Sequence, residues 1–310
     1  MPSSSVADAA VDCEVVVVGG GPAGCSAGVF TARYGLDTLV FDRGNAALPR
    51  CASLENYLGF PGGIDVEVFR DLMRTHAETA GCEIVPEMVV SVERADEGRF
   101  AVETGDGRRV LTEHVLAAAW YDGSYLRPLD EDAMFETHEH HGELEERFDP
   151  EYPDEDGRTP VDGLYVASPA GGRSAQAIVA AGNGAHVARS LIEDRRRERG
   201  YSGGTAPHYD WLRSASEFSG EWENRDRWRE WFENEFADDH DLDPDRFEEL
   251  RETYIDQAFE TQVTPEEAEN RSERGLRQLV ETIGTDRILG AVDDEAIRDH
   301  LHGSSSREQE

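Results

Sequence analysis

Lysine is absent from this sequence of 310 residues, and all 30 of its basic side chains are arginine. Acidic residues number 66, which leaves a formal net charge of −36. A surface this negative cannot neutralise the phosphates of a duplex, so we exclude general nucleic-acid binding. Carboxylates keep such a surface hydrated, and concentrated cations screen their mutual repulsion. We therefore predict a halophilic protein.

Long apolar runs are also missing. No run approaches the roughly 20 residues that a membrane-spanning helix needs. The opening residues, MPSSSVADAAVDCE, have neither a basic start nor an apolar signal core. We therefore expect a cytoplasmic protein with no membrane partner.

Cysteine is scarce, and none of the four has the C-x-x-C spacing. The sequence therefore supports neither a metal site nor a vicinal redox disulfide. We interpret Cys13 and Cys25 as small core residues. Cys51 lies in a predicted loop and is the one cysteine worth considering as reactive, although burial or inertness is the simpler interpretation.

Three histidines, His138, His140 and His141, stand among glutamates in an acidic, turn-rich stretch over residues 129–160. Three histidines this close in the sequence suggest a metal site. A Glu-rich stretch of this kind is more typical of a solvated linker, and we predict no metal there.

A glycine motif connects the first predicted strand (14–18) to a helix expected from about Pro22 to Tyr34. In Gly19-x-Gly21-x-x-Gly24, the first glycine permits a tight turn, the second lets a pyrophosphate approach the backbone, and the third lets the helix pack on the strand. The helix N-terminus offers N–H groups to the anion, and Asp42, which ends the strand over 38–42, can bind ribose hydroxyls. An acid there favours FAD or NAD over NADP. A Rossmann-like turn without a ligand is the structural alternative.

Residues 19–44 resemble the opening of thioredoxin reductase-like FAD proteins, and they read GGGPAGCSAGVFTARYGLDTLVFDRG. LENYLGFPGGID (54–65) is similar to the loop of that family that approaches the flavin. GLYVAS with SAQAIVAAGNGAHVA (163–188) resembles its closing segment, where a Gln and a helix N-terminus meet the pyrimidine end of the flavin. The resemblance covers roughly residues 12–195 and implies an FAD cofactor.

The departures from this family are informative. Only residues 120–162 separate the matching segments, far fewer than the ~100 residues of a nucleotide-binding domain. The resemblance therefore implies an FAD domain without its NAD(P)H domain or redox disulfide. Trp120 and Pro169 alter two flavin-side motifs, and Pro169 stands where the family has an Asp. We predict that Arg173, beside two glycines, compensates by offering a cation to phosphate.

Further helices and strands are predicted before residue 200, and the tail after it is predicted to be helical. An amphipathic pattern covers 65–80, three strand-like stretches occupy 83–116 around a turn at 105–107, and a helix is expected from about Ser174 to Arg196. We predict an α/β fold: a Rossmann-like FAD-binding domain over 1–199, with a parallel sheet, helices and a β-hairpin or meander, then a small acidic all-α unit over 205–310. The tail aromatics, Trp211, Trp222, Trp228, Trp231, Phe232 and Phe236, are expected to form the core of that unit.

Two functions are compatible with these features. The first is an FAD-dependent oxidoreductase fed by an unidentified electron donor or redox partner protein. The second is a degenerate flavin or nucleotide domain that acts as a non-catalytic interaction or regulatory module. The resemblance and the Trp-rich tail suggest a homodimer, and no catalytic residue is predicted. The predicted cofactor-binding residues are Gly19, Gly21, Pro22, Ala23, Gly24, Asp42, Arg43, Asn56, Arg173, Gln176 and Ala177.

Overall fold

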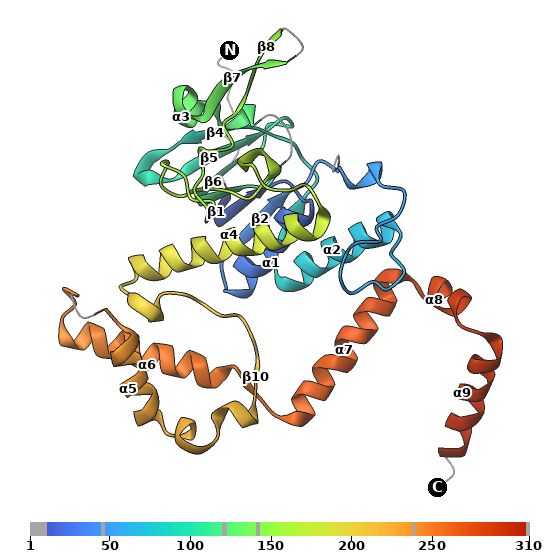
Figure 1. Cartoon of the computed structure of the whole chain (residues 1–310). Coiled ribbons are helices and arrows are strands. Elements are labelled where there is room, and N and C mark those ends of the chain that lie inside the picture. Colours follow the sequence, from blue (N-terminus) through green and yellow to red (C-terminus); the bar gives the residue numbers. More distant parts are fainter. Residues whose placement is uncertain (1–10, 45–46, 120–122, 141–142, 238–239, 308–310) are drawn as a thin grey trace, which may run out of the picture. The chain divides into compact units, whose positions relative to one another are not determined.

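A computed structural model describes residues 11–44, 47–119, 123–140, 143–237 and 240–307 (Figure 1). Its backbone packs as two compact units, Met1–Gln262 and Val263–Glu310. The domain division predicted between residues 199 and 205 falls inside the first unit and stays a prediction. Within the described ranges, no helix is both long enough and apolar enough to cross a membrane.

The first unit is built on a seven-stranded sheet in the order β3-β2-β1-β6-β5-β4, with β9 also paired to β6. The predicted parallel sheet is confirmed, because β1, β2, β3, β6 and β9 run parallel, while β4 and β5 form an antiparallel meander with β6. The strands are β1 (Val11–Val18), β2 (Thr38–Phe41), β3 (Glu83–Val85), β4 (Val89–Arg94), β5 (Phe100–Thr104), β6 (Arg109–Ala117) and β9 (Leu164–Val166).

The valines of β1 divide between two cores. Val15 and Val17 pack with residues of α1 (Pro22–Arg33) and α4 (Ala177–Glu198), which lie side by side along one face of the sheet with α2 (Val66–Ala80) next to α1 (Figure 1). Val16 and Val18 join a second core with residues of the meander. All four are at most 1% exposed. A central parallel strand is covered on both faces, which explains its continuous β-branched run.

The stretch over 129–160 differs from its prediction. It is not a solvated linker: α3 (Arg127–Met134) leads into a hairpin of β7 (Phe135–His140) and β8 (Glu143–Phe148). Two apolar residues at its base, Met134 and Phe148, are buried in the meander core, and this burial explains why the acidic stretch is ordered. The side chains of His138, His140 and His141 lie outside the described part of the structure.

The predicted helices of the tail are confirmed. In the first unit, α5 (Arg225–Glu235) and α6 (Pro244–Glu260) pack through Trp228, Trp231, Phe232 and Phe236, with Trp222 partly buried. Trp211 is the exception, since its side chain is 61% exposed and stacks on Tyr209. Short strands β10 (Arg213–Ser214) and β11 (Gln262–Val263) accompany these helices. The second unit contains α7 (Pro265–Ile283), α8 (Thr285–Ala291) and α9 (Asp294–Arg307).

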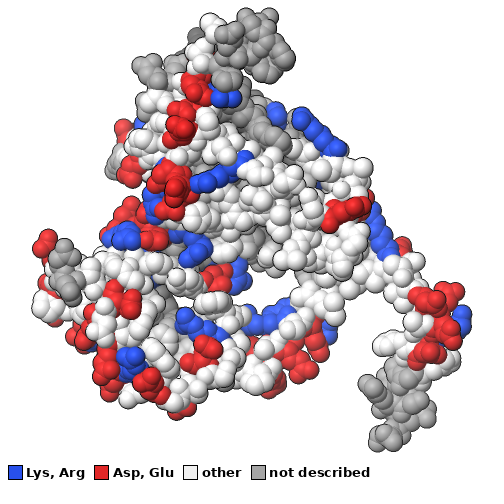
Figure 2. Space-filling model, viewed as in Figure 1, with Lys and Arg blue, Asp and Glu red and all other residues white. Residues whose placement is uncertain are grey.

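Many arginines of the first unit are paired with acidic side chains. Arg158 contacts Asp194 at 2.7 Å, and Arg229 contacts Glu252 at 2.8 Å. On the face drawn in Figure 2, most arginines lie beside acidic residues and do not gather into a basic patch. Exposed pairs of this kind each contribute less than about 1 kcal/mol, so they cannot by themselves offset the repulsion of a chain with a net charge of −36.

Candidate functional site

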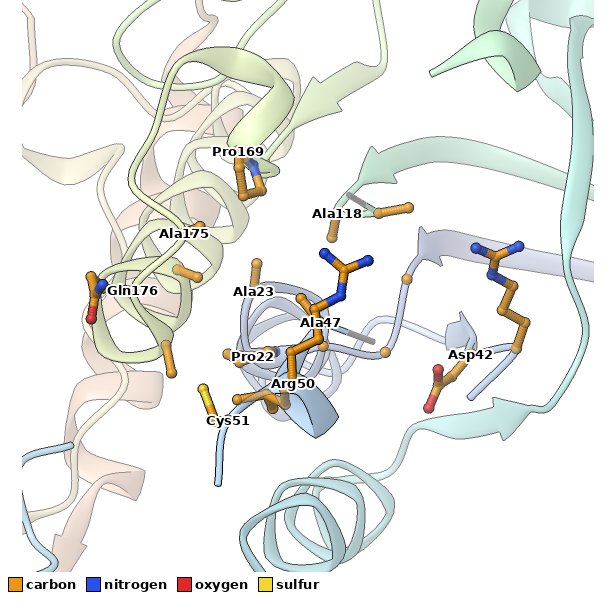
Figure 3. A pocket seen from close by; sticks show the side chains of 18 of the residues that line it. Pro22, Ala23, Asp42, Ala47, Arg50, Cys51, Ala118, Pro169, Ala175 and Gln176 are labelled. Carbon is orange, nitrogen blue, oxygen red and sulfur yellow. The ribbon is translucent and has the colours of Figure 1, made fainter. Parts of the chain in front are cut away.

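A pocket of about 1000 Å³ opens where the parallel strands β1, β2 and β6 end (Figure 3). From β1 the chain proceeds through α1 to β2 on one side, whereas β6 lies on the other side. The order of the strands therefore reverses at β1. In open α/β sheets, ligands bind at this switch point, beyond the carboxyl ends of the strands. The volume is at the upper end of the range for small-molecule and cofactor sites.

The glycine motif forms one wall of the pocket. Gly19 has a φ of 111°, in the region where glycine is favoured, and it follows directly on β1. A Cβ on Gly24 would stand 1.7 Å from the carbonyl oxygen of Gly19, so only glycine lets α1 approach the turn this closely. Gly21 is the N-cap of α1, makes no side-chain cap hydrogen bond, and has open space where a Cβ would lie. The first-turn N–H groups of α1 are therefore suited to an anion.

Asp42 lies at the end of β2 and lines the pocket. Asp42 is buried, and its carboxylate accepts a hydrogen bond from the Gly44 backbone N–H at 2.9 Å and pairs with Arg74 on α2 at 3.1 Å. Arg74 is a contact that the sequence did not indicate. These two donors hold the carboxylate in place at the wall formed by Gly20, where it can accept hydrogen bonds from ribose hydroxyls.

The opposite end of the pocket joins two segments that are 120 residues apart in the sequence. The Asn56 side chain donates from Nδ2 to Oε1 of Gln176 at 2.8 Å. Gln176 is the N-cap residue of α4, and Ala177 is the first residue of that helix. All three residues line the pocket. A second helix N-terminus, with its positive potential, thus faces the same cavity as α1.

Nine of the eleven predicted cofactor-binding residues line this one pocket. These are Gly19, Gly21, Pro22, Ala23, Asp42, Arg43, Asn56, Gln176 and Ala177. Gly24 is buried between α1 and the turn and acts in packing. Arg173 is not brought to the pocket, because its Nη2 donates to the carbonyl oxygen of Glu155 at 2.6 Å. Since α4 begins at Ala177 and not near Ser174, Arg173 precedes the helix by four residues.

Arg50 and Cys51 also line the pocket, and sequence reasoning did not assign either to a cofactor. They lie at the end of a short 3-10 helix, η1 (Leu48–Arg50). No motif marks this loop, so only the tertiary structure places it. Pro169, which stands where the resembling family has an acid, lines the pocket as well, and Trp120 lies outside the described residues.

The cysteines of the described structure are all free thiols. Burial, and to a lesser degree the charge of Asp42, raises the pKa of Cys25 to about 12. Burial likewise raises the pKa of Cys82 to about 11. Both remain protonated at neutral pH, which agrees with the interpretation of Cys25 as a core residue. Cys51 is exposed at the pocket.

Comparison with known proteins identifies this region. Residues 12–55 match a family model described as an FAD binding domain. Among curated proteins, the chain is 38% identical over 93 residues to a thioredoxin reductase of Streptomyces coelicolor, and 42% identical over 82 residues to one of Streptomyces clavuligerus. The first match covers 29% of each chain and the second covers 26% of each. The chain therefore matches less than a third of the length of these relatives.

The fold has a solved counterpart as well. The structure of a thioredoxin reductase from Gloeobacter violaceus aligns with a TM-score of 0.50 at 18% identity, covering 66% of this chain and 98% of that one. Residues 12–55 match an FAD binding domain, and the chain is similar to the two Streptomyces thioredoxin reductases over less than a third of its length and shares the fold of these enzymes. FAD is its cofactor.

The residues of this FAD-binding domain fit the cofactor chemically. Asp42 suits the adenosine ribose, and the uncapped start of α1 suits the pyrophosphate. The second helix N-terminus, at Gln176, suits the electron-rich end of the flavin. Each part of FAD thus has a group of complementary charge or hydrogen-bonding character in a pocket of adequate volume.

Proposed function

We propose that this protein is an FAD-dependent oxidoreductase that receives its electrons from a donor outside its own chain, either a partner protein or a diffusing reductant. The observation that carries this proposal is the convergence of the glycine motif, Asp42, Asn56 and Gln176 on one pocket. A bound FAD supplies hydride and single-electron transfer.

The lack of an internal nicotinamide domain is part of the proposal. Residues 118–163, which connect β6 to β9, include α3 and the β7–β8 hairpin. This connection is shorter than the roughly 100 residues typical of a nucleotide-binding domain. It occupies the place where the resembling reductases insert their second domain. The four cysteines include no C-x-x-C pair, so the chain has no motif of the kind that passes electrons from a flavin to a disulfide. This also favours an external redox partner.

The chain's own residues position the cofactor. The N-terminus of α1 orients the pyrophosphate, Asp42 orients the ribose, and the hydrogen bond between Asn56 and Gln176 joins the loop after η1 to α4 at the flavin end. Because the two halves of the site come from opposite ends of the domain, cofactor binding is expected to stabilise the fold by mass action.

The test is an absorbance spectrum of the protein purified or reconstituted with FAD in molar KCl, followed by anaerobic reduction. We expect oxidised-flavin bands at about 370 and 450 nm that dithionite bleaches and that NADPH alone does not. A protein that stays colourless after reconstitution contradicts the flavin site. Efficient NADPH-driven disulfide reduction by this chain alone contradicts the external donor.

A further inference from the structure

Two arginines line the pocket, and they differ in their contacts. Arg43 approaches the sulfur of Met88, with Nη1 at 3.3 Å from Sδ. The guanidinium of Arg50 has neither a hydrogen-bond nor an ion-pair partner among the residues that the structure describes. Arg199, Arg274, Arg287 and Arg298 also lack such partners among the described residues, but none of them lines the pocket. A cation that faces a cavity and has no hydrogen-bond or ion-pair partner in the described part of the chain is available to a ligand.

The backbone around Arg50 is held in place. The side chain of Leu48, at the start of η1, is buried at 7% exposure against Val66 and Phe69 of α2. The Arg50 backbone N–H donates to the carbonyl oxygen of Ala47 at 3.0 Å. Figure 3 shows the Arg50 guanidinium pointing into the pocket, toward Ala118 and past Pro22 and Ala23 at the start of α1. It therefore faces the region that the glycine motif offers to an anion.

We propose that Arg50 binds the pyrophosphate of FAD, in the role that the sequence assigned to Arg173. This inference rests on the proposed FAD site. A pyrophosphate diester carries about two negative charges, whereas a helix N-terminus offers only about half a positive charge. Acidic residues also line the pocket, and two of them, Asp42 and Glu87, are already paired with Arg74 and Arg108. Arg50 supplies the remaining cation, and its planar guanidinium matches two phosphate oxygens at once.

The test compares FAD and ADP binding, by calorimetric titration at one fixed KCl concentration, for the wild type and three variants. Arg50→Ala removes the cation, Arg50→Lys keeps the charge without the fork, and Arg109→Ala is the matched control. Arg109 is an exposed arginine at the amino end of β6, opposite the pocket, and its contact with Glu103 is long at 3.8 Å. ADP contains the pyrophosphate without the flavin, so it reports on that part alone.

We expect Arg50→Ala to raise the dissociation constants of FAD and ADP together, by roughly 10- to 100-fold, the range for a charged hydrogen bond. Arg50→Lys should raise them less, and Arg109→Ala should leave them within about twofold. Because the Arg50 side chain makes no hydrogen bond or ion pair with the described residues, the melting temperatures of the apo-proteins should be nearly the same.

Three results would overturn the assignment in distinguishable ways. Unchanged FAD and ADP affinities in Arg50→Ala, with FAD bound by the wild type, refute the role of Arg50 and leave the FAD site standing. Weakened FAD binding with unchanged ADP binding places Arg50 at the flavin and refutes the pyrophosphate contact. A wild type that binds neither FAD nor ADP refutes the proposed function itself.

Discussion

The contact between α1 and α4 allows a matched pair of substitutions on one helix. A Cβ added to Gly184 of α4 would stand 2.0 Å from the carbonyl oxygen of Ala23, with two further backbone atoms of Ala23 within 2.8 Å. A Cβ added to Gly182, two residues earlier in the same helix, would meet nothing within 4 Å. Gly184→Ala and Gly182→Ala therefore make the same chemical change in opposite packing environments.

The magnitude follows from these distances. Both variants gain about 0.5–1 kcal/mol, because alanine is a better helix former than glycine. Only Gly184→Ala must also push the two helices apart, since the atoms it meets belong to the backbone and cannot rotate away. Overpacking of this kind costs about 1–3 kcal/mol. The helix-propensity gain cancels between the variants, so their melting temperatures should differ by roughly 2–10 °C.

Two measurements check this expectation in molar KCl. Thermal unfolding followed by circular dichroism should place Gly182→Ala slightly above the wild type and Gly184→Ala below it. Because Ala23 lines the pocket, Gly184→Ala should also weaken FAD binding, whereas Gly182→Ala should not. Equal melting temperatures for the two variants would refute the close packing of α1 on α4.

Two further predictions concern salt and pH. With a net charge of −36, the melting temperature should rise steeply between about 0.1 and 3 M KCl, and a flat profile would contradict the halophilic interpretation. Burial, and then the charge of Arg195, lowers the pKa of His114 on β6 to about 4 from an ordinary 6.5. Between these two values the imidazole is protonated in the unfolded chain and neutral in the folded chain. The free energy of unfolding therefore falls as the pH drops from about 6.5 to about 4. Between about pH 7 and 4.5, the wild type should lose about 2.5 kcal/mol more unfolding free energy than His114→Leu does. Parallel pH profiles of unfolding free energy for the two proteins would refute this.

Local sequence patterns predicted most of the secondary structure. The β-branched run before the glycine motif, the pattern over 65–80 and the turn at 105–107 each depend on neighbours in the chain, and each is present in the structure. Two tail helices also begin at residues that commonly cap helices: Asp243 accepts from the Arg246 N–H and Thr264 from the Glu267 N–H. The prediction of a solvated linker over residues 129–160 was wrong. The acidic stretch over 129–160 pairs as a hairpin because Met134 and Phe148 find a core, and composition cannot reveal that core.

Local sequence was enough to predict the nucleotide-binding turn, because glycine spacing, a helix start and an acid at the next strand end all act within about thirty residues. Which charges face the cofactor depends on the tertiary structure. Arg173 and Arg50 look alike as loop arginines, yet one contacts the Glu155 carbonyl and the other points into the pocket. Likewise, Gly182 and Gly184 are indistinguishable in the sequence, and only the approach of α1 makes one of them indispensable. Contacts between distant segments depend on how the sheet and helices pack, and no local pattern encodes that arrangement.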